Sequence, residues 1–392
     1  MSKEAIVKKM IQTMTNCIRY EVCGQSDPIV VPEDSVRFWS NLYQLSKSHD
    51  LAHLVGDALI KNGLLPDGEI KSKFEKQLMM AVYRYERINY ELNSVRKALN
   101  KAEIPFIPLK GSVLRQYYPE PWMRTSCDID ILIHERDLDR AVSLLVSDLS
   151  YRKELKGSHD VSLFSQSGVH LELHYSLIEE KSIGQAESVL QTVWENASPI
   201  DGTSEYLLSD EMFYYYHIAH MAKHFVGGGC GIRPFLDIWV LNHCKNGDLE
   251  KRNVLLVAGG LDSFAASADR LSQVWFDGAE HTELTAQMEQ YLLSGGVYGT
   301  TENRVSVQQV RKGGKFRYIL SRIWIPYNVL KFRYPSLEGK KILLPFYEVR
   351  RWLAFPFRGN VKRSVHELKV NSTTSKDEQD AAKRMLSELH LT

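Results

Sequence analysis

Three carboxylates on two apolar runs are the residues of this sequence best suited to chemistry. Asp128 and Asp130 alternate with isoleucines in the run 128–133, and Glu172 lies in the run 169–174, where apolar and polar residues alternate. Such alternation is typical of half-buried β-strands. Because alternate strand residues share a face at about 3.3 Å per residue, the two aspartates project together roughly 6.6 Å apart.

This arrangement suits a pair of divalent cations. Two-metal sites hold their ions about 3.5–4 Å apart, and Mg²⁺ prefers oxygen ligands. Asp128 and Asp130, with a triphosphate, supply most of that coordination. Glu172 is expected to be the third metal ligand and the general base that takes the proton of an acceptor hydroxyl.

A glycine turn precedes the carboxylates. Lys110-Gly111-Ser112 follows the apolar, strand-like run 104–109 and leads into a helix expected over 112–118. Backbone N–H groups at a strand-to-helix turn bind phosphate, and glycine permits close approach. Ser112 adds a hydroxyl donor, while Lys110 and Arg115 add positive charge, so these residues are expected to bind the nucleotide.

Together these parts predict a metal-dependent nucleotidyltransferase. It would transfer a nucleoside monophosphate from an NTP such as ATP to an acceptor hydroxyl or phosphate, with two Mg²⁺ or Mn²⁺ ions, and release pyrophosphate. A small molecule, a sugar, a peptide or a tRNA end would all serve as acceptor. Two alternatives stay open: a nucleotide- or RNA-binding module without turnover, and a toxin-like enzyme that modifies tRNA. The kinase and helicase classes are excluded because their glycine-rich signatures are missing from the sequence.

The same residues resemble an uncharacterised bacterial nucleotidyltransferase family of the polymerase-beta-like superfamily. The resemblance implies a palm with a mixed sheet, two metal ions and pyrophosphate release, and it adds Arg124 to the expected nucleotide-binding residues. Two features depart from relatives: fifteen residues separate Ser112 from Asp128, and the third carboxylate is Glu172 where many relatives have aspartate. The resemblance is carried by 109–112, 117–119, Arg124, 128–133 and 172–174.

Patterning predicts an α+β protein of four regions. Residues 1–100 form an N-terminal helical region that ends in an amphipathic run over 69–100, with Phe74, Leu78, Val82, Tyr85 and Ile88 as its apolar positions. The palm occupies 101–205, with strands at 104–109, 127–133, 162–164 and 170–175 and a helix at 136–149. A helical domain over 206–310 packs on the palm, starting at a cap at Ser209 and broken at Gly227–Gly229. The last region, 311–392, is basic and aromatic, with a flexible linker at 371–375 before a polar tail helix.

Composition indicates a globular protein. The 392 residues are 44% hydrophobic and 25% charged, and the five cysteines have no paired spacing. With no long apolar stretch, the expectation is a cytoplasmic protein, either free or peripheral to a membrane. Cys127, next to Asp128, is expected in the core.

Several further polar residues are secondary site candidates. His217, His220 and His224 share one face of an expected helix, but His217 and His224 lie about 10 Å apart along its axis, which favours a polar lining over a tetrahedral zinc site, the alternative that stays open. They are expected to line the cleft or to pack as satisfied polar groups. The full set of secondary candidates is His174, His220, Lys223, His224, Arg233 and Asp237.

The stretch 311–363 has an unusual charge. It contains fourteen Lys and Arg, two acids and eleven aromatics, a net charge of +12, so the remaining chain sums to −11. Three interpretations stay open: aromatic core residues beneath solvated cations, an anionic membrane surface, or contact with RNA.

Overall fold

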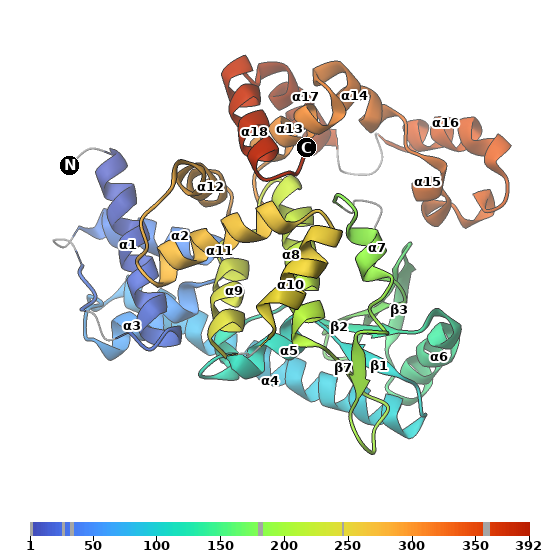
Figure 1. Ribbon diagram of the computed structural model, residues 1–392, viewed down its shortest axis with the longest axis horizontal. Helices are drawn as coiled ribbons and strands as arrows, with labels where there is room; N and C mark the ends of the chain where they lie inside the picture. The colour runs from blue at the N-terminus through green and yellow to red at the C-terminus, as the bar shows by residue number, and fades with distance from the viewer. Residues whose placement is uncertain (1–2, 26–27, 32–34, 179–182, 245–246, 356–360) are drawn as a thin grey trace.

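A mixed five-stranded β-sheet surrounded by helices gives this protein an α+β fold (Figure 1). The computed structural model describes residues 3–25, 28–31, 35–178, 183–244, 247–355 and 361–392, with side chains from residue 6 onward. Among these residues, no helix combines the length and the apolar character needed to cross a bilayer.

The sheet has the strand order β1-β2-β5-β4-β3. Strands β2 and β5 are parallel neighbours, and every other pair is antiparallel. The register places Asp128 opposite His170 and Asp130 opposite Glu172. The strands are β1 (Phe106–Pro108), β2 (Asp128–Ile133), β3 (Arg152–Lys156), β4 (Asp160–Phe164) and β5 (His170–His174).

The two faces of the sheet differ. Ile129 and Ile131 of β2 and Leu171 and Leu173 of β5 are fully buried in a core shared with helices α4 (Glu69–Lys101) and α6 (Leu138–Asp148). Because side chains alternate along a strand, the aspartates of β2 and Glu172 point to the opposite face. The apolar face thus fixes the strands, and the polar face is left for chemistry.

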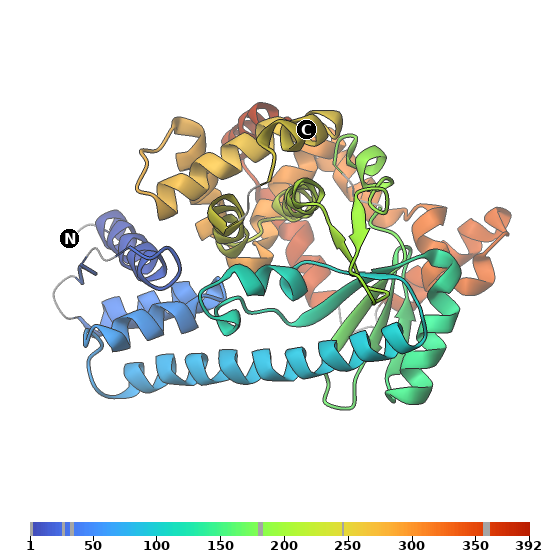
Figure 2. The same cartoon turned by 60° about the horizontal axis from the view of Figure 1, so that its bottom comes forward.

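Helix α4 is the longest element, about 50 Å at 1.5 Å per residue. Figure 2 shows it along the base of the molecule, from the N-terminal helices to the sheet. Its range agrees with the predicted amphipathic run, and Phe74 and Ile88 are buried as expected. Val82 is exposed, because only a narrow side of the helix meets partners, so its predicted apolar contact is wrong.

One large core joins distant parts of the chain, from Met10 to Leu391. It includes residues of the N-terminal helices, the central helices and the C-terminal end. The four predicted region boundaries stay a prediction. The N-terminal helices are α1 (Lys3–Val22), α2 (Val36–Ser48) and α3 (Ala52–Lys61), and the central ones are α7 (Ala186–Leu190), α8 (Asp210–Val226), α9 (Arg233–Cys244), α10 (Leu249–Ala258), α11 (Asp262–Phe276) and α12 (Glu283–Leu293).

The C-terminal helices lie together at one side of the molecule (Figure 1). The final polar helix is confirmed, and a capping box at Ser375 begins it. The flexible linker predicted over 371–375 is wrong in its first half, because Asn371 is buried and accepts a hydrogen bond from Gln309. The helices are α13 (Thr301–Lys312), α14 (Lys315–Ile323), α15 (Tyr327–Arg333), α16 (Leu344–Ala354), α17 (Val361–Thr373) and α18 (Lys376–Glu388).

One predicted helix cap is confirmed, and three short strands were not predicted from the sequence. Ser209 caps α8 by accepting a hydrogen bond from the Met212 N–H, as predicted. Strand β3 was not predicted, because all five of its residues are exposed and leave no apolar alternation. The short pair β6 (Ala197–Pro199) and β7 (Tyr206–Leu208) was missed as well.

Candidate active site

The parallel pairing of β2 and β5 gathers the predicted carboxylates on one face. Asp128, His170 and Glu172 form one group whose ligand atoms lie within 4.8 Å of one another, and Asp130, Glu172 and His174 form a second. The two groups share Glu172. We call these five residues, together with Lys110, the acid cluster.

Asp130 is the most buried acid of the cluster, with 2% of its surface exposed. Lys110 Nζ donates a hydrogen bond to its Oδ1 at 2.8 Å, and His174 Nε2 lies 2.9 Å from the same oxygen. Burial alone would raise the pKa of Asp130, but Lys110 and His174 hold it below its ordinary value. Asp130 is therefore ionised at neutral pH.

His174 links two of the acids. Its Nε2 lies 3.5 Å from Glu172 Oε2 in addition to its contact with Asp130. Burial lowers the pKa of His174, but the hydrogen bonds to these carboxylates outweigh burial and raise it to about 9. The same contact lowers the pKa of the Glu172 carboxyl. His174 is thus a protonated neighbour of the acids at neutral pH.

Asp128 is the carboxylate of the acid cluster whose negative charge is least balanced by neighbouring cations. Burial raises its pKa, and the nearby Asp130 carboxylate raises it further, while Lys110 opposes both. Three acids face the two cationic groups Lys110 and His174, so one negative charge is in excess. An oxygen-rich group with excess negative charge fits a hard divalent cation.

The turn before α5 (Gly111–Leu114) has an unusual backbone. Lys110 has φ of 46°, in the left-handed region that costs a non-glycine residue of order 1–3 kcal/mol. The sequence suggested that Gly111 would allow a close approach of phosphate to the backbone, yet the structure shows a different need for a glycine at this position. A Cβ there would lie 3.0 Å from Ser126 Cβ, so the turn packs tightly against the segment that leads into β2.

Ser112 is placed for a ligand. Its hydroxyl is buried and has no hydrogen-bond partner among the described residues, while its N–H donates to Leu109 O at 3.1 Å. The helix expected over 112–118 is a single α-helical turn followed by a 3-10 turn at Arg115–Tyr117. A helix this short offers little dipole, so the support for phosphate binding comes from the Ser112 hydroxyl and from Lys110.

Arg115 stabilises the glycine turn through two hydrogen bonds. Its Nε donates to Gly111 O at 2.7 Å, and its Nη2 donates to Ser126 Oγ at 2.8 Å. Burial lowers its pKa to about 10. The guanidinium is engaged by the turn itself, so Arg115 positions Gly111.

Arg124 and Asp237 form a separate buried pair. The guanidinium donates to both carboxylate oxygens, with Nε at 2.6 Å from Oδ1 and Nη2 at 2.8 Å from Oδ2. Tyr118 adds a third hydrogen bond to Oδ1 at 2.7 Å. Burial would raise the pKa of Asp237, but Arg124 holds it below its ordinary value. The structure does not bring this pair into the acid cluster.

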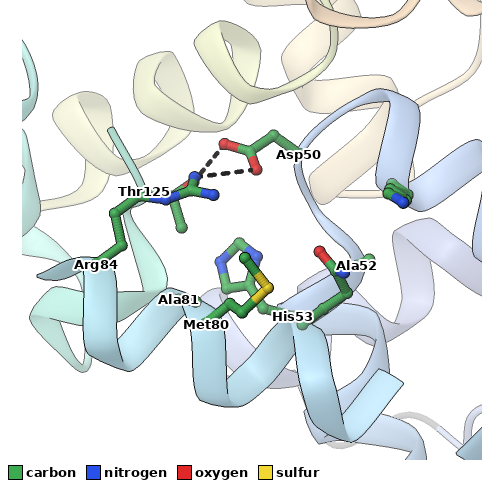
Figure 3. A pocket seen from close by; sticks show the side chains of 9 residues that line it. Asp50, Ala52, His53, Met80, Ala81, Arg84 and Thr125 are labelled. Atoms are coloured by element: carbon green, nitrogen blue, oxygen red, sulfur yellow. Dashed lines mark hydrogen bonds and ion pairs between the residues drawn. The ribbon is translucent and has the colours of Figure 1, made fainter. Parts of the chain in front are cut away.

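Arg233 belongs to a third polar group, centred on Asp50. Figure 3 shows two other members of this group, Arg84 and Thr125, beside Asp50. Arg233 Nη1 lies 2.6 Å from Asp50 Oδ2, which also accepts a hydrogen bond from Thr125 at 2.7 Å. Arg84 approaches the other oxygen at 3.6 Å and contacts Cys127 Sγ at 4.0 Å. Cys127 is exposed, so its predicted core position is wrong: it precedes β2 and faces Arg84.

Helix α8 lies beside the acid cluster. After burial, the Lys110 ammonium is the charge that lowers the pKa of His220 most, and Tyr216 on the same helix interacts with Lys110. His220 Nε2 and His224 Nε2 are 3.1 Å apart. His217 Nε2 lies 2.9 Å from Pro234 O, so its ring has a backbone partner.

Several of these residues could not have been found from the sequence. Asp50 and Arg84 belong to no motif and lie far along the chain from Arg233. Tyr216 had a signal, since it stands four residues before His220 on a helix and so shares its face. Lys223, also on α8, is half-buried.

The chain belongs to a family described as uncharacterised nucleotidyltransferases, whose model matches residues 36–277. The match covers the acid cluster, the glycine turn and helix α8. No curated protein matches the chain. No solved structure matches it either.

Proposed function

We propose that this protein transfers a nucleoside monophosphate from an NTP to a hydroxyl or phosphate of an acceptor, with Asp128, Asp130 and Glu172 as its catalytic carboxylates. The observation that carries the proposal is the register of β2 and β5. It sets two groups of oxygen and nitrogen ligands side by side with Glu172 in both. Adjacent groups with a shared carboxylate suit two cations held a few ångströms apart.

Asp128, Asp130 and Glu172 would hold Mg²⁺ or Mn²⁺. Such ions, when bound, supply Lewis-acid stabilisation of the phosphate charge that develops during transfer. The donors fit, because all three are carboxylates and the cluster has an excess of negative charge. His174 contacts two of these carboxylates and so holds them in place.

Lys110 and Ser112 would bind the triphosphate. The Lys110 ammonium already neutralises Asp130 and stands in the glycine turn, so it can pair with that carboxylate or with a phosphate oxygen. The buried Ser112 hydroxyl lacks a partner among the described residues, and a phosphate oxygen would supply one. Arg115 and Gly111 shape the turn that presents both groups.

Glu172 would accept the proton of the attacking hydroxyl. Its side chain is about one quarter exposed, and the hydrogen bond from His174 lowers its pKa, so it is ionised at neutral pH and reachable by an acceptor. His220, Lys223 and His224 on α8 would line the cleft beside it. Arg124, Arg233 and Asp237 would act further away, as the framework that fixes the segment before β2.

The function is tested by incubating the protein with each labelled NTP, Mg²⁺ or Mn²⁺ and a cell extract. The expected result is covalent transfer of label with release of pyrophosphate, lost on addition of EDTA. NTP binding without transfer in any extract would instead identify a nucleotide-binding module, and neither binding nor transfer would contradict the proposal.

A further inference from the structure

Helices α14 and α16 of the basic C-terminal region each expose apolar side chains along one side. On α14, Phe316, Leu320 and Ile323 recur at spacings of four and three residues and are exposed, Phe316 by 71%. On α16, Phe346 and Leu353 lie seven residues apart and are 65% and 71% exposed. Such spacing puts each set on one side of its helix.

The two helices are joined where α14 ends. Trp352 Nε1 on α16 donates to Ile323 O at 3.2 Å, and Arg351 bonds the same oxygen. Glu348 accepts a hydrogen bond from the Ile325 N–H at 2.6 Å. These bonds fix α16 against the end of α14, so their exposed side chains belong to one part of the molecule, at its periphery in Figure 1.

This part buries little of its apolar content. Its own core holds Leu330, Tyr334, Leu337 and Tyr347. The interpretation that the aromatics of 311–363 are core residues is confirmed for the buried tyrosines and wrong for four others. Those four exposed aromatics are Phe316, Trp324, Phe346 and Trp352.

Positive charge surrounds the apolar side chains. Arg317 lies next to Phe316, and Arg350 lies on the exposed side of α16 between Phe346 and Leu353. Lys340 and Lys341 are exposed before Ile342, which is 89% exposed. The whole stretch sums to +12 against −11 for the rest of the chain.

We propose that this basic apolar face, formed by α14 and α16, rests on an anionic lipid bilayer. Helices with cations beside exposed leucine, isoleucine and aromatic side chains bury the apolar groups at the headgroup boundary and attract anionic lipids. Val349 on α16 is also exposed, by 58%. RNA would use the cations and stack on aromatics, but it leaves Leu320, Val349 and Leu353 in water. A second copy would bring two strongly positive surfaces together, which like-charge repulsion opposes.

The proposal is tested with full-length protein and sedimented vesicles. We expect binding to vesicles with about 30% phosphatidylglycerol and at least about tenfold weaker binding to pure phosphatidylcholine. The variant Phe346→Ser/Val349→Ser/Leu353→Ser should lose about tenfold or more in partitioning, because its apolar contact is removed. The variant Lys340→Gln/Lys341→Gln/Arg350→Gln should lose the preference for anionic lipid.

A matched control comes from α4, where Met79, Tyr83 and Tyr90 are equally exposed but lie outside the basic stretch. Their triple serine variant should bind anionic vesicles as the wild type does. Equal binding to neutral and anionic vesicles, or equal loss in this control, overturns the proposal. A wild type that does not bind vesicles also overturns the proposal. Binding of single-stranded RNA, or dimerisation through this face, would then identify the occupant instead. Circular dichroism of each variant ensures that a loss comes from a folded chain.

Discussion

The acid cluster and the Arg124–Asp237 pair are both charged groups held by the fold, but they are built differently. In the pair, one cation meets one anion through two hydrogen bonds, Tyr118 adds a third, and none of the carboxylate is exposed. In the acid cluster, three carboxylates share two cationic neighbours, and Asp128 and Glu172 stay partly exposed. The charges of the pair are balanced within the protein, whereas the three carboxylates of the cluster outnumber its two cationic neighbours.

The difference separates two kinds of site residue that the sequence could not tell apart. A paired and buried charge costs stability when one partner is removed, because the other is left without compensation. A crowded, partly unbalanced charge costs function when removed, and stability can even rise. Substitutions in the buried pair and in the acid cluster are therefore expected to have opposite effects on stability and on activity.

The largest expected effect is on catalysis. Glu172→Gln should lower kcat by about 10²–10⁴-fold, because a glutamine cannot take the proton of the acceptor hydroxyl and binds cations poorly. The check is steady-state transfer of label from an NTP, with circular dichroism to verify the fold. A variant that keeps most of its activity would remove Glu172 from the chemistry.

The buried pair should show the opposite behaviour. Asp237→Asn should lower the free energy of unfolding by about 3–5 kcal/mol, because Arg124 would lose its counter-charge in the interior. Tyr118→Phe, which removes one hydrogen bond to the same carboxylate, should cost only about 1 kcal/mol. Urea unfolding measures both. Equal, small losses would show that the pair is not the closed ion pair described above.

The stability of the protein should also depend on pH through a buried histidine that lacks a charged partner. His49 is fully buried, neither ring nitrogen has a partner among the described residues, and burial lowers its pKa from 6.5 to about 4. The unfolded chain then binds one more proton than the native state between these values, so stability falls as pH drops from about 6.5 to 4. In His49→Leu, the slope of unfolding free energy against pH in this window should decrease by up to about 1.4 kcal/mol per pH unit. An unchanged slope would contradict a neutral buried His49.

The smallest effect is expected at the glycine turn. Ser112→Ala should raise KM for the NTP about fivefold, the equivalent of one hydrogen bond to phosphate, with Tm unchanged or slightly raised because the hydroxyl has no partner in the free protein. Thermal melts with and without NTP and Mg²⁺ complete the measurement. A loss of Tm with no change in KM would make Ser112 a packing residue.

The sequence predicted what depends on local pattern. Strand β2 and the long α4 have strong periodicity, so their ranges and the facing of Asp128 and Asp130 could be read directly. Pairings between distant residues could not. Arg124 and Asp237 lie 113 residues apart, and no spacing rule joins them, so Arg124 was assigned to the nucleotide and Asp237 separately to the secondary candidates.

The sequence also could not predict the backbone conformation of the glycine turn or the exposure of the C-terminal aromatic side chains. The left-handed φ of Lys110 occurs where a glycine follows immediately, and pattern alone favours the glycine. The exposure of Phe316 and Phe346 depends on which neighbouring helices cover α14 and α16, and that is a property of the tertiary fold. Composition indicated the charge of this region, while the structure shows the apolar side chains that lie among the cations.

Asp128→Asn tests the central account most directly. Burial raises the pKa of the half-buried Asp128, and the neighbouring Asp130 carboxylate raises it further. Neutralising Asp128 therefore removes repulsion in the free protein and also removes one of the proposed cation ligands. The measurement is metal-dependent transfer from an NTP together with Tm, for wild type and variant in the same buffer. We expect transfer to fall by at least about 10³-fold, consistent with loss of a metal ligand, while Tm stays equal or rises. Retained transfer, or a large loss of Tm alongside lost transfer, would contradict the account.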